Sequence, residues 1–144
     1  MALKKLYTAT ATSTGGRGSG RAKTADGFLD LKIGTPKALG GNDDGNNPEQ
    51  LFAALYSTCY LGAIKFVAGK EKKPVTISAD SEVTAHVTLG ARDDKKGFGI
   101  AVKLEVKLPG VSKAVATSLA KKAHVVCPFS HAIKKTVKVP TKIV

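Results

Sequence analysis

One long apolar segment constrains the fold of this chain more than any other feature of its sequence. Asn47 is a good helix N-cap, Pro48 suits the first helical position, and Gln50 stands where a capping box requires Glu or Gln. The helix that begins there is predicted to end near residues 68–69, where a glycine precedes a lysine cluster. Its apolar residues fall on all sides, so the fold has to enclose it all round. A single thin sheet would leave one side of this helix in water.

Strand patterns flank this helix on both sides. Five segments have the composition of β-strands, and several alternate apolar with polar residues: 6–12, 28–33, 75–89, 100–108 and 136–144. Ser112 is predicted to cap a second helix, which Pro128 ends by disfavouring helical geometry at Cys127, and residues 130–135 add a short helical turn. The order of strands and helices predicts an α+β fold. No repeat or long linker divides the chain, so we expect a single domain over residues 1–144.

The net charge of +12 suggests an anionic partner, and its distribution narrows the choice. Residues 95–144 hold 11 of the 23 cationic residues, all of them lysine, against Glu105 as the single acidic residue. Proteins that bind nucleic acid rely on arginine for bidentate contacts and on aromatic side chains for stacking. This basic third offers only Phe98 and Phe129. We therefore expect no nucleic-acid partner; a basic binding module is the alternative, which tight, salt-dependent DNA retention would support.

The location of the protein is predicted from its apolar segments. The first seven residues have no apolar run of signal-peptide length, and the apolar stretch 51–67 is interrupted by hydroxyl residues and a lysine. We therefore expect a cytoplasmic protein without a membrane span. Two cysteines, Cys59 and Cys127, are too few for a disulfide-stapled secreted domain. A cytoplasmic disulfide between them would be catalytic rather than structural.

Cys59 offers chemistry, although a small buried hydrophobe is the simpler interpretation of a cysteine in a core helix. A reactive cysteine has to be a thiolate, and burial alone raises the pKa of a thiol. The helix dipole fades after the first turn, whereas Cys59 lies about three turns along the helix. A cation must therefore come from elsewhere, and Arg17 in its glycine-rich loop is the candidate, with a solvated loop charge as the alternative. Lowering the thiol pKa by about two units requires about 2.7 kcal/mol, the size of one desolvated guanidinium contact.

Glu49 would hold Arg17 by a bidentate salt bridge, with compensation of the helix dipole as the alternative. Ten residues separate Glu49 from Cys59, which is about 15 Å of helix rise, so one helix cannot place both at the same arginine. Two antiparallel copies of the helix across a two-fold axis would bring Glu49 of one chain near Cys59 of the other. A site of this kind therefore predicts a homodimer.

Three segments resemble the organic hydroperoxide resistance (Ohr) branch of the OsmC-like proteins. They are Thr-Gly-Gly-Arg at 14–17, the segment from Asn-Pro-Glu-Gln to Ser-Thr-Cys at 47–59, and Ala-His-Val-Val-Cys-Pro-Phe-Ser at 123–130. The resemblance covers essentially the whole chain, and the Asn-Pro-Glu-Gln and His-x-x-Cys-Pro segments together are specific. It implies an OsmC-like fold, in which two helices pack between antiparallel β-sheets, and an intertwined homodimer.

The same resemblance implies a reaction. Cys59 matches the peroxidatic cysteine of such proteins and Cys127 the resolving cysteine that forms a disulfide with it. Arg17 and Glu49 match the residues that hold the thiolate and position the peroxide; we prefer Arg17 to Arg21 because it directly follows the matching glycines. The implied substrates are organic hydroperoxides, and the implied reductant is dihydrolipoamide or a lipoylated protein. We expect no metal or organic cofactor.

A metal site is the rival interpretation of the same residues. His124, Cys127 and His131, together with Cys59, are four side chains of the type that bind zinc. The separation of Cys59 from the other three in sequence is unlike a typical zinc site, which usually contains a close cysteine pair. Stoichiometric metal in the purified protein would support this rival.

Overall fold

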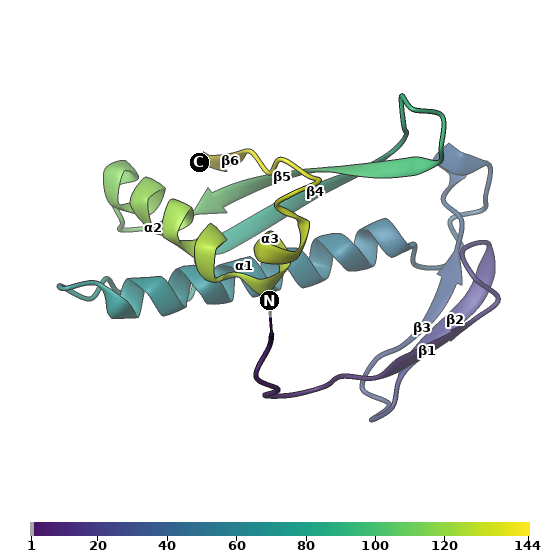
Figure 1. The fold of residues 1–144 in the computed structure, drawn as a ribbon, viewed down its shortest axis with the longest axis horizontal. Helices are drawn as coiled ribbons and strands as arrows, with labels where there is room; N and C mark the ends of the chain where they lie inside the picture. The colour runs from purple at the N-terminus through teal and green to yellow at the C-terminus, as the bar shows by residue number, and fades with distance from the viewer. Residues whose placement is uncertain (1) are drawn as a thin grey trace. The chain divides into compact units, whose positions relative to one another are not determined.

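The computed structural model describes residues 2–144 and has the α+β architecture expected from the sequence (Figure 1). The strands are β1 Ala11–Thr14, β2 Ser19–Thr24, β3 Asp30–Gly34, β4 Glu82–Ala91, β5 Phe98–Lys107 and β6 Thr141–Ile143. The helices are α1 Pro48–Lys70, α2 Lys113–Val126 and α3 Pro128–Ile133, with a 3-10 turn, η1, at Lys37–Leu39. The chain forms two compact units, of which the first ends at Leu51 and the second is Phe52–Val144. This division into compact units does not test the single domain expected over residues 1–144, which remains a prediction.

The first unit contains a three-stranded antiparallel sheet in the order β1-β2-β3. The turn between β1 and β2 depends on Gly15, whose φ of 68° lies in the left-handed region and whose added Cβ would meet the carbonyl oxygen of Ser19 at 2.0 Å. Ala22 and Ile33 are the buried apolar side chains of this sheet, and most of its other positions are exposed. The sheet thus provides a glycine turn that carries Arg17 but buries few apolar side chains of its own.

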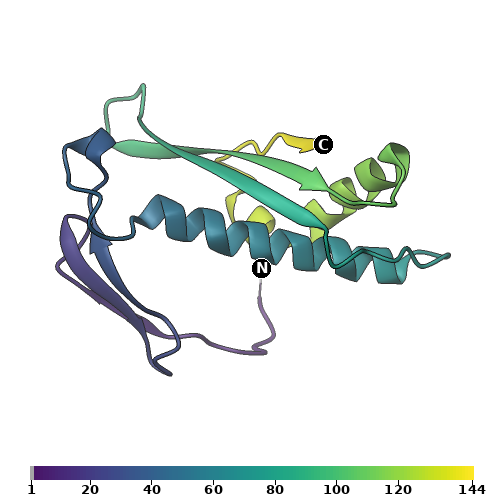
Figure 2. The same cartoon turned by 180° about the vertical axis from the view of Figure 1, so that it is seen from behind.

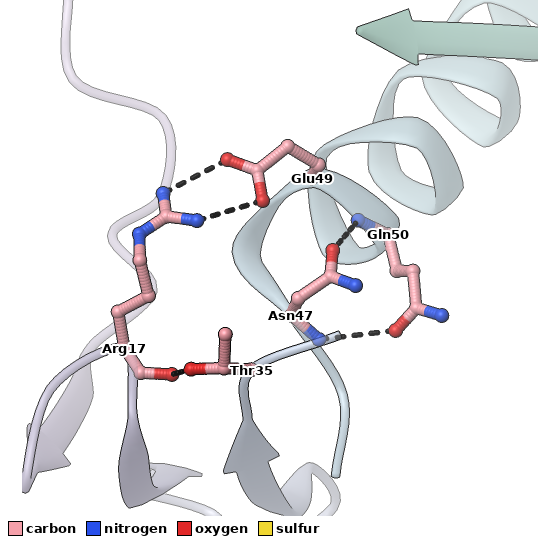
Figure 3. A network of polar contacts seen from close by, with 5 residues as sticks. All are labelled: Arg17, Thr35, Asn47, Glu49 and Gln50. Atoms are coloured by element: carbon pink, nitrogen blue, oxygen red, sulfur yellow. Dashed lines mark hydrogen bonds and ion pairs between the residues drawn. The ribbon is translucent and has the colours of Figure 1, made fainter. Parts of the chain in front are cut away.

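The start of α1 confirms the predicted capping box. The backbone N–H of Gln50 donates to Oδ1 of Asn47 at 2.9 Å, and the backbone N–H of Asn47 donates to Oε1 of Gln50 at 3.0 Å (Figure 3). Pro48 occupies the first helical position, where its missing N–H costs nothing. The helix ends at Lys70, one or two residues beyond the predicted end. Local capping chemistry therefore fixes the position of Glu49 in the first turn.

The second unit contains a sheet in the order β4-β5-β6. The two ten-residue strands β4 and β5 form an antiparallel hairpin, whereas β6 pairs parallel to β5. This sheet is therefore not wholly antiparallel, because the chain passes through α2 and α3 before β6 returns to the edge of β5. The predicted strand 75–89 begins only at Glu82, and the predicted strand 136–144 is confined to the three residues of β6.

Helix α1 runs along the β4–β5 hairpin in both views (Figures 1 and 2). The largest fully buried side chains of the core come from α1, β5 and α2 and from the residue that follows α2: Tyr56, Tyr60, Ile64, Leu104, Val106, Leu119 and Cys127. By length and composition α1 could also cross a membrane, but a buried core helix of a soluble protein passes the same test. Membership of this core supports the second interpretation.

The second unit leaves one face of α1 partly uncovered. Leu55 is 37% exposed and Phe66 is 58% exposed, although both are apolar residues of a helix in the core. The second unit by itself therefore does not enclose this helix on all sides. A second covering surface is needed to complete the enclosure.

Candidate active site

The two cysteines meet in the second unit. Cys127 Sγ lies 3.7 Å from Cys59 Sγ, and both residues are free thiols. Cys127 is fully buried, whereas Cys59 is partly exposed. A disulfide bond has an S–S distance of about 2.05 Å, so a small side-chain rotation would close this contact into a bond. Two predicted site residues that lie 68 positions apart in the sequence are thus in van der Waals contact.

The position of Cys127 follows from Pro128. The proline makes Cys127 leave helical geometry, with φ −67° and ψ 119°, and this single residue both ends α2 and begins α3. Its backbone N–H donates to the carbonyl of Ala123 at 2.8 Å, and its own carbonyl accepts from the N–H of His131 at 3.0 Å. The prediction of Cys127 at the C-terminal edge of the second helix is confirmed. The short helix, predicted at 130–135, lies at Pro128–Ile133.

The environment of Cys59 opposes thiolate formation. Burial raises the pKa of Cys59 to about 11, the neighbouring Cys127 acts in the same direction, and a hydrogen bond from the backbone of Phe129 acts against them. A thiol with this pKa is almost entirely protonated at neutral pH. The contact between the two sulfurs therefore places the reactive atoms together but does not activate them.

Arg17 and Glu49 form a bidentate ion pair in the first unit. Nη1 and Nη2 of Arg17 donate to the two carboxylate oxygens of Glu49 at 2.9 and 2.8 Å (Figure 3). The hydrogen bond from Arg17 is the main reason that the pKa of Glu49 is lowered. The Glu49 side chain is 15% exposed and that of Arg17 is 44% exposed, so the carboxylate is covered while the guanidinium keeps an open side. The pair therefore presents a fixed positive group to an anion.

The second arginine of the same hairpin has a different partner. Nε and Nη2 of Arg21 donate to the carboxylate of Asp30 on β3 at 2.5 and 2.7 Å. This ion pair raises the pKa of Arg21 and lowers that of Asp30. Arg21 is thus paired with a residue of the neighbouring strand, whereas Arg17 at the turn is paired with Glu49 in the first turn of α1. The two arginines of this hairpin therefore have different acidic partners, Glu49 for Arg17 and Asp30 for Arg21.

The rival zinc set is not assembled. Among residues 2–144, no group of three or more His, Cys, Asp or Glu side chains is placed to hold a metal ion. Both ring nitrogens of His124 contact hydroxyl groups instead, Nδ1 that of Ser130 at 3.0 Å and Nε2 that of Thr141 at 2.8 Å.

Sequence reasoning missed a set of polar residues beside the cysteines. Tyr56 and Ser130 are buried, and their hydroxyl groups lie 2.8 Å apart. Ser130 also contacts His124, which the sequence suggested only as a possible zinc ligand. Tyr56, His124 and Ser130 each lie three residues from a cysteine, and this spacing could have indicated from the sequence that they lie near the cysteine pair.

Comparisons with known proteins agree on one family. The family model described as OsmC-like protein matches residues 41–142. The chain is 47% identical over 137 residues to the organic hydroperoxide resistance protein of Xanthomonas axonopodis pv. citri, covering 94% of this chain and 93% of that protein. It is 38% identical to organic hydroperoxide resistance protein OhrA of Bacillus subtilis, covering 96% of each.

A solved structure supports the same assignment. The crystal structure of an organic hydroperoxide resistance protein OsmC from Legionella pneumophila matches with a TM-score of 0.89 at 41% identity, covering 97% of this chain and 98% of that chain. The fold described above is therefore that of the OsmC-like proteins. With relatives of this similarity over nearly its whole length, the chain belongs to the organic hydroperoxide resistance (Ohr) branch of the OsmC-like family.

Proposed function

We propose that this protein is a cysteine-based peroxidase that reduces organic hydroperoxides, alkyl or lipid, to alcohols during oxidative stress. The observation that carries the proposal is the 3.7 Å contact between the free thiols of Cys59 and Cys127. Two thiols in this position are suited to a cycle of oxidation to a disulfide and re-reduction. The names of the relatives supply the substrate class, since they are organic hydroperoxide resistance proteins.

In the first step the Cys59 thiolate attacks the distal oxygen of the hydroperoxide, in line with the O–O bond. An S–O bond forms as the O–O bond breaks, and the alkoxide that leaves takes up a proton to become the alcohol. The sulfur loses two electrons to the peroxide and becomes a sulfenic acid. Cys59 is the better candidate for this attack because it is partly exposed, while Cys127 is fully buried.

In the second step the sulfur of Cys127 attacks the sulfenic sulfur of Cys59. An S–S bond forms, the S–O bond breaks, and the hydroxyl leaves as water with the thiol proton of Cys127. Because the two sulfurs are already in contact, this step competes with further oxidation of Cys59 to sulfinic acid.

The first step needs a cation, and Arg17 is the residue we assign to supply it. Bringing a thiol pKa from about 11 to about 7 requires about 5 kcal/mol of preferential stabilisation of the anion. This is larger than the value that an unperturbed thiol requires, and it is within the range measured for desolvated ion pairs. Glu49 fixes the guanidinium, whose exposed side would stabilise both the thiolate and the charge on the leaving oxygen.

A homodimer completes this proposal. The distance along one helix between Glu49 and Cys59 requires a second chain if one arginine is to serve both, as the sequence predicts. Exposed apolar side chains support a partner, because nine large ones among residues 2–144 are more than half exposed: Leu3, Leu6, Tyr7, Phe28, Leu39, Phe66, Phe98, Val125 and Val144. A second copy would also cover the open face of α1.

The cycle can be tested with one equivalent of cumene hydroperoxide added to the reduced protein. We expect two thiols to disappear, and mass spectrometry of the digest to find a Cys59–Cys127 link. The physical reason is the contact of the two sulfurs, which leaves the sulfenic acid no closer partner. Survival of both thiols would contradict the peroxidase, and loss of a single thiol would contradict the resolving role of Cys127.

The excess of lysine in residues 95–144 suggests what kind of reductant the protein uses. We assign re-reduction to dihydrolipoamide or a lipoylated protein in the cytoplasm, with no metal or organic cofactor bound, and infer that the lysines steer an acidic carrier domain. Turnover with a lipoylated protein should then fall steeply between low salt and about 0.5 M salt, because the Debye length shrinks from about 10 Å at 0.1 M toward 3 Å at 1 M. Turnover with free dihydrolipoamide is the control and should change little. Equal salt responses would show that the charge serves solubility alone.

A further inference from the structure

A continuous series of hydrogen bonds joins four side chains from the elements that carry the cysteine pair and from β6. The hydroxyl of Tyr56 on α1 lies 2.8 Å from Oγ of Ser130 on α3, and that oxygen lies 3.0 Å from Nδ1 of His124 on α2. The other ring nitrogen of His124, Nε2, lies 2.8 Å from Oγ1 of Thr141 on β6. Ser130 is 4% exposed, so its hydrogen bonds are protected from competition with water.

The members of this series are spaced regularly about the two cysteines. Tyr56 precedes Cys59 by three residues, His124 precedes Cys127 by three, and Ser130 follows Cys127 by three. The bond between His124 and Ser130 therefore closes the α2–α3 elbow across Cys127, while the bond from Tyr56 ties that elbow to α1 one turn before Cys59. These three side chains thus connect α1, α2 and α3, the helices that hold Cys59 and flank Cys127.

One arrangement of the protons satisfies every hydroxyl donor in this series of hydrogen bonds. Thr141 donates its hydroxyl proton to the carbonyl of Val139 at 3.3 Å, so its oxygen accepts from Nε2–H of His124. Nδ1 of the neutral imidazole then accepts from the hydroxyl of Ser130, which in turn accepts from the hydroxyl of Tyr56. Burial lowers the pKa of His124, in agreement with a neutral ring. Each of the three hydroxyl protons, those of Tyr56, Ser130 and Thr141, then has an acceptor.

We propose that Ser130, held between Tyr56 and His124, is a positioning residue that keeps Cys127 aligned for attack on Cys59 and so sets the rate of disulfide formation. This inference rests on the proposed function, because it concerns the second step of that cycle. The bond between His124 and Ser130 fixes the angle between α2 and α3, the two helices that Cys127 joins, so its loss would let Cys127 Sγ shift. A displacement of about 1 Å costs about 100-fold in a reaction between oriented groups. The first step, at Cys59 on the long helix α1, does not depend on this alignment.

Replacement of Ser130 by alanine tests the inference with the smallest change. Ser130→Ala removes one buried oxygen and two hydrogen bonds, and we expect cumene hydroperoxide to oxidise Cys59 at the wild-type rate. Disulfide formation should then slow by about 10- to 100-fold, and dimedone should trap the accumulated sulfenic acid at Cys59. The matched control is Ser118→Ala, a serine exposed on α2, which should leave both rates unchanged.

Two substitutions of His124 separate positioning from general damage to the fold. His124→Asn keeps an acceptor near the place of Nδ1 for Ser130, whereas His124→Leu provides none, so asparagine should retain faster disulfide formation. Equal slowing of both chemical steps in Ser130→Ala, or disulfide formation at the wild-type rate, would overturn the inference. If the wild-type protein consumed no hydroperoxide, the proposed function would fall instead. Oxidation of the dithiol by diamide, which needs no peroxidase chemistry, would still compare disulfide formation in the wild type and Ser130→Ala.

Discussion

Cys59→Ser is expected to abolish the consumption of organic hydroperoxide, lowering kcat/KM by about 10⁴-fold or more. A serine hydroxyl is not ionised near neutral pH, and its oxygen is a far weaker nucleophile toward peroxide than a thiolate sulfur. The remaining thiol, Cys127, cannot replace it because it is fully buried. Residual hydroperoxide measured over time in the presence of dihydrolipoamide would give the rate.

Cys127→Ser is the matched control, since it makes the same exchange of sulfur for oxygen at the other half of the pair. This variant should consume one equivalent of hydroperoxide per chain and stop at an oxidised Cys59. Normal turnover of Cys127→Ser with dihydrolipoamide would show that its resolving role is wrong. Full activity in Cys59→Ser would show that the peroxidatic role belongs elsewhere.

Arg17→Ala is expected to reduce peroxide consumption at pH 7 by about 10³-fold and to make the remaining rate depend on pH. Without the guanidinium, burial leaves the pKa of Cys59 near the value of about 11, so about one thiol in 10⁴ is ionised at pH 7. The thiolate is the reactive form, and at pH values below the pKa its fraction increases about tenfold for each unit by which the pH is raised. The rate of the variant should therefore climb between pH 7 and pH 10, while the wild-type rate stays nearly constant. Initial rates with a saturating reductant across this range provide the check.

Arg21→Ala is the control for this prediction, because it removes an arginine of the same hairpin whose partner is Asp30. It should retain the wild-type rate at pH 7 within about threefold. A loss in Arg17→Ala that does not change with pH would contradict a role in thiolate stabilisation. Equal losses in both arginine variants would point to damage of the sheet.

Features that depend on a few neighbouring residues could be predicted from the sequence. The reciprocal hydrogen bonds of Asn47 and Gln50, the cap from Ser112 to the N–H of Val115 and the helix end at Cys127 all follow from local side-chain chemistry. The order of strands and helices was equally accessible, because each element carries its own periodicity. These local signals predicted that Glu49 lies in the first turn of one helix and that Cys127 lies at the end of another.

Features that depend on distant partners could not be predicted in the same way. Residues 75–81 have strand-like composition but find no strand to pair with, so β4 starts at Glu82. The contact of Tyr56 with Ser130 joins residues 74 positions apart, and no pattern within either segment specifies it. The direction of the pKa shift of Cys59 could be predicted from its place in a core helix, whereas the contribution of Cys127 depends on a residue 68 positions away.

The separation of 3.7 Å between the two sulfurs affects how well a peroxidase working by the proposed cycle would resist over-oxidation. Groups held in good orientation react as though one were present at an effective molarity on the order of 10⁵ M or above. A second hydroperoxide at about 1 mM is about 10⁸-fold more dilute than such a neighbour. In the proposed cycle, the sulfenic acid is therefore captured by Cys127 long before another oxidant arrives, and the protein can work through a burst of peroxide without inactivating itself.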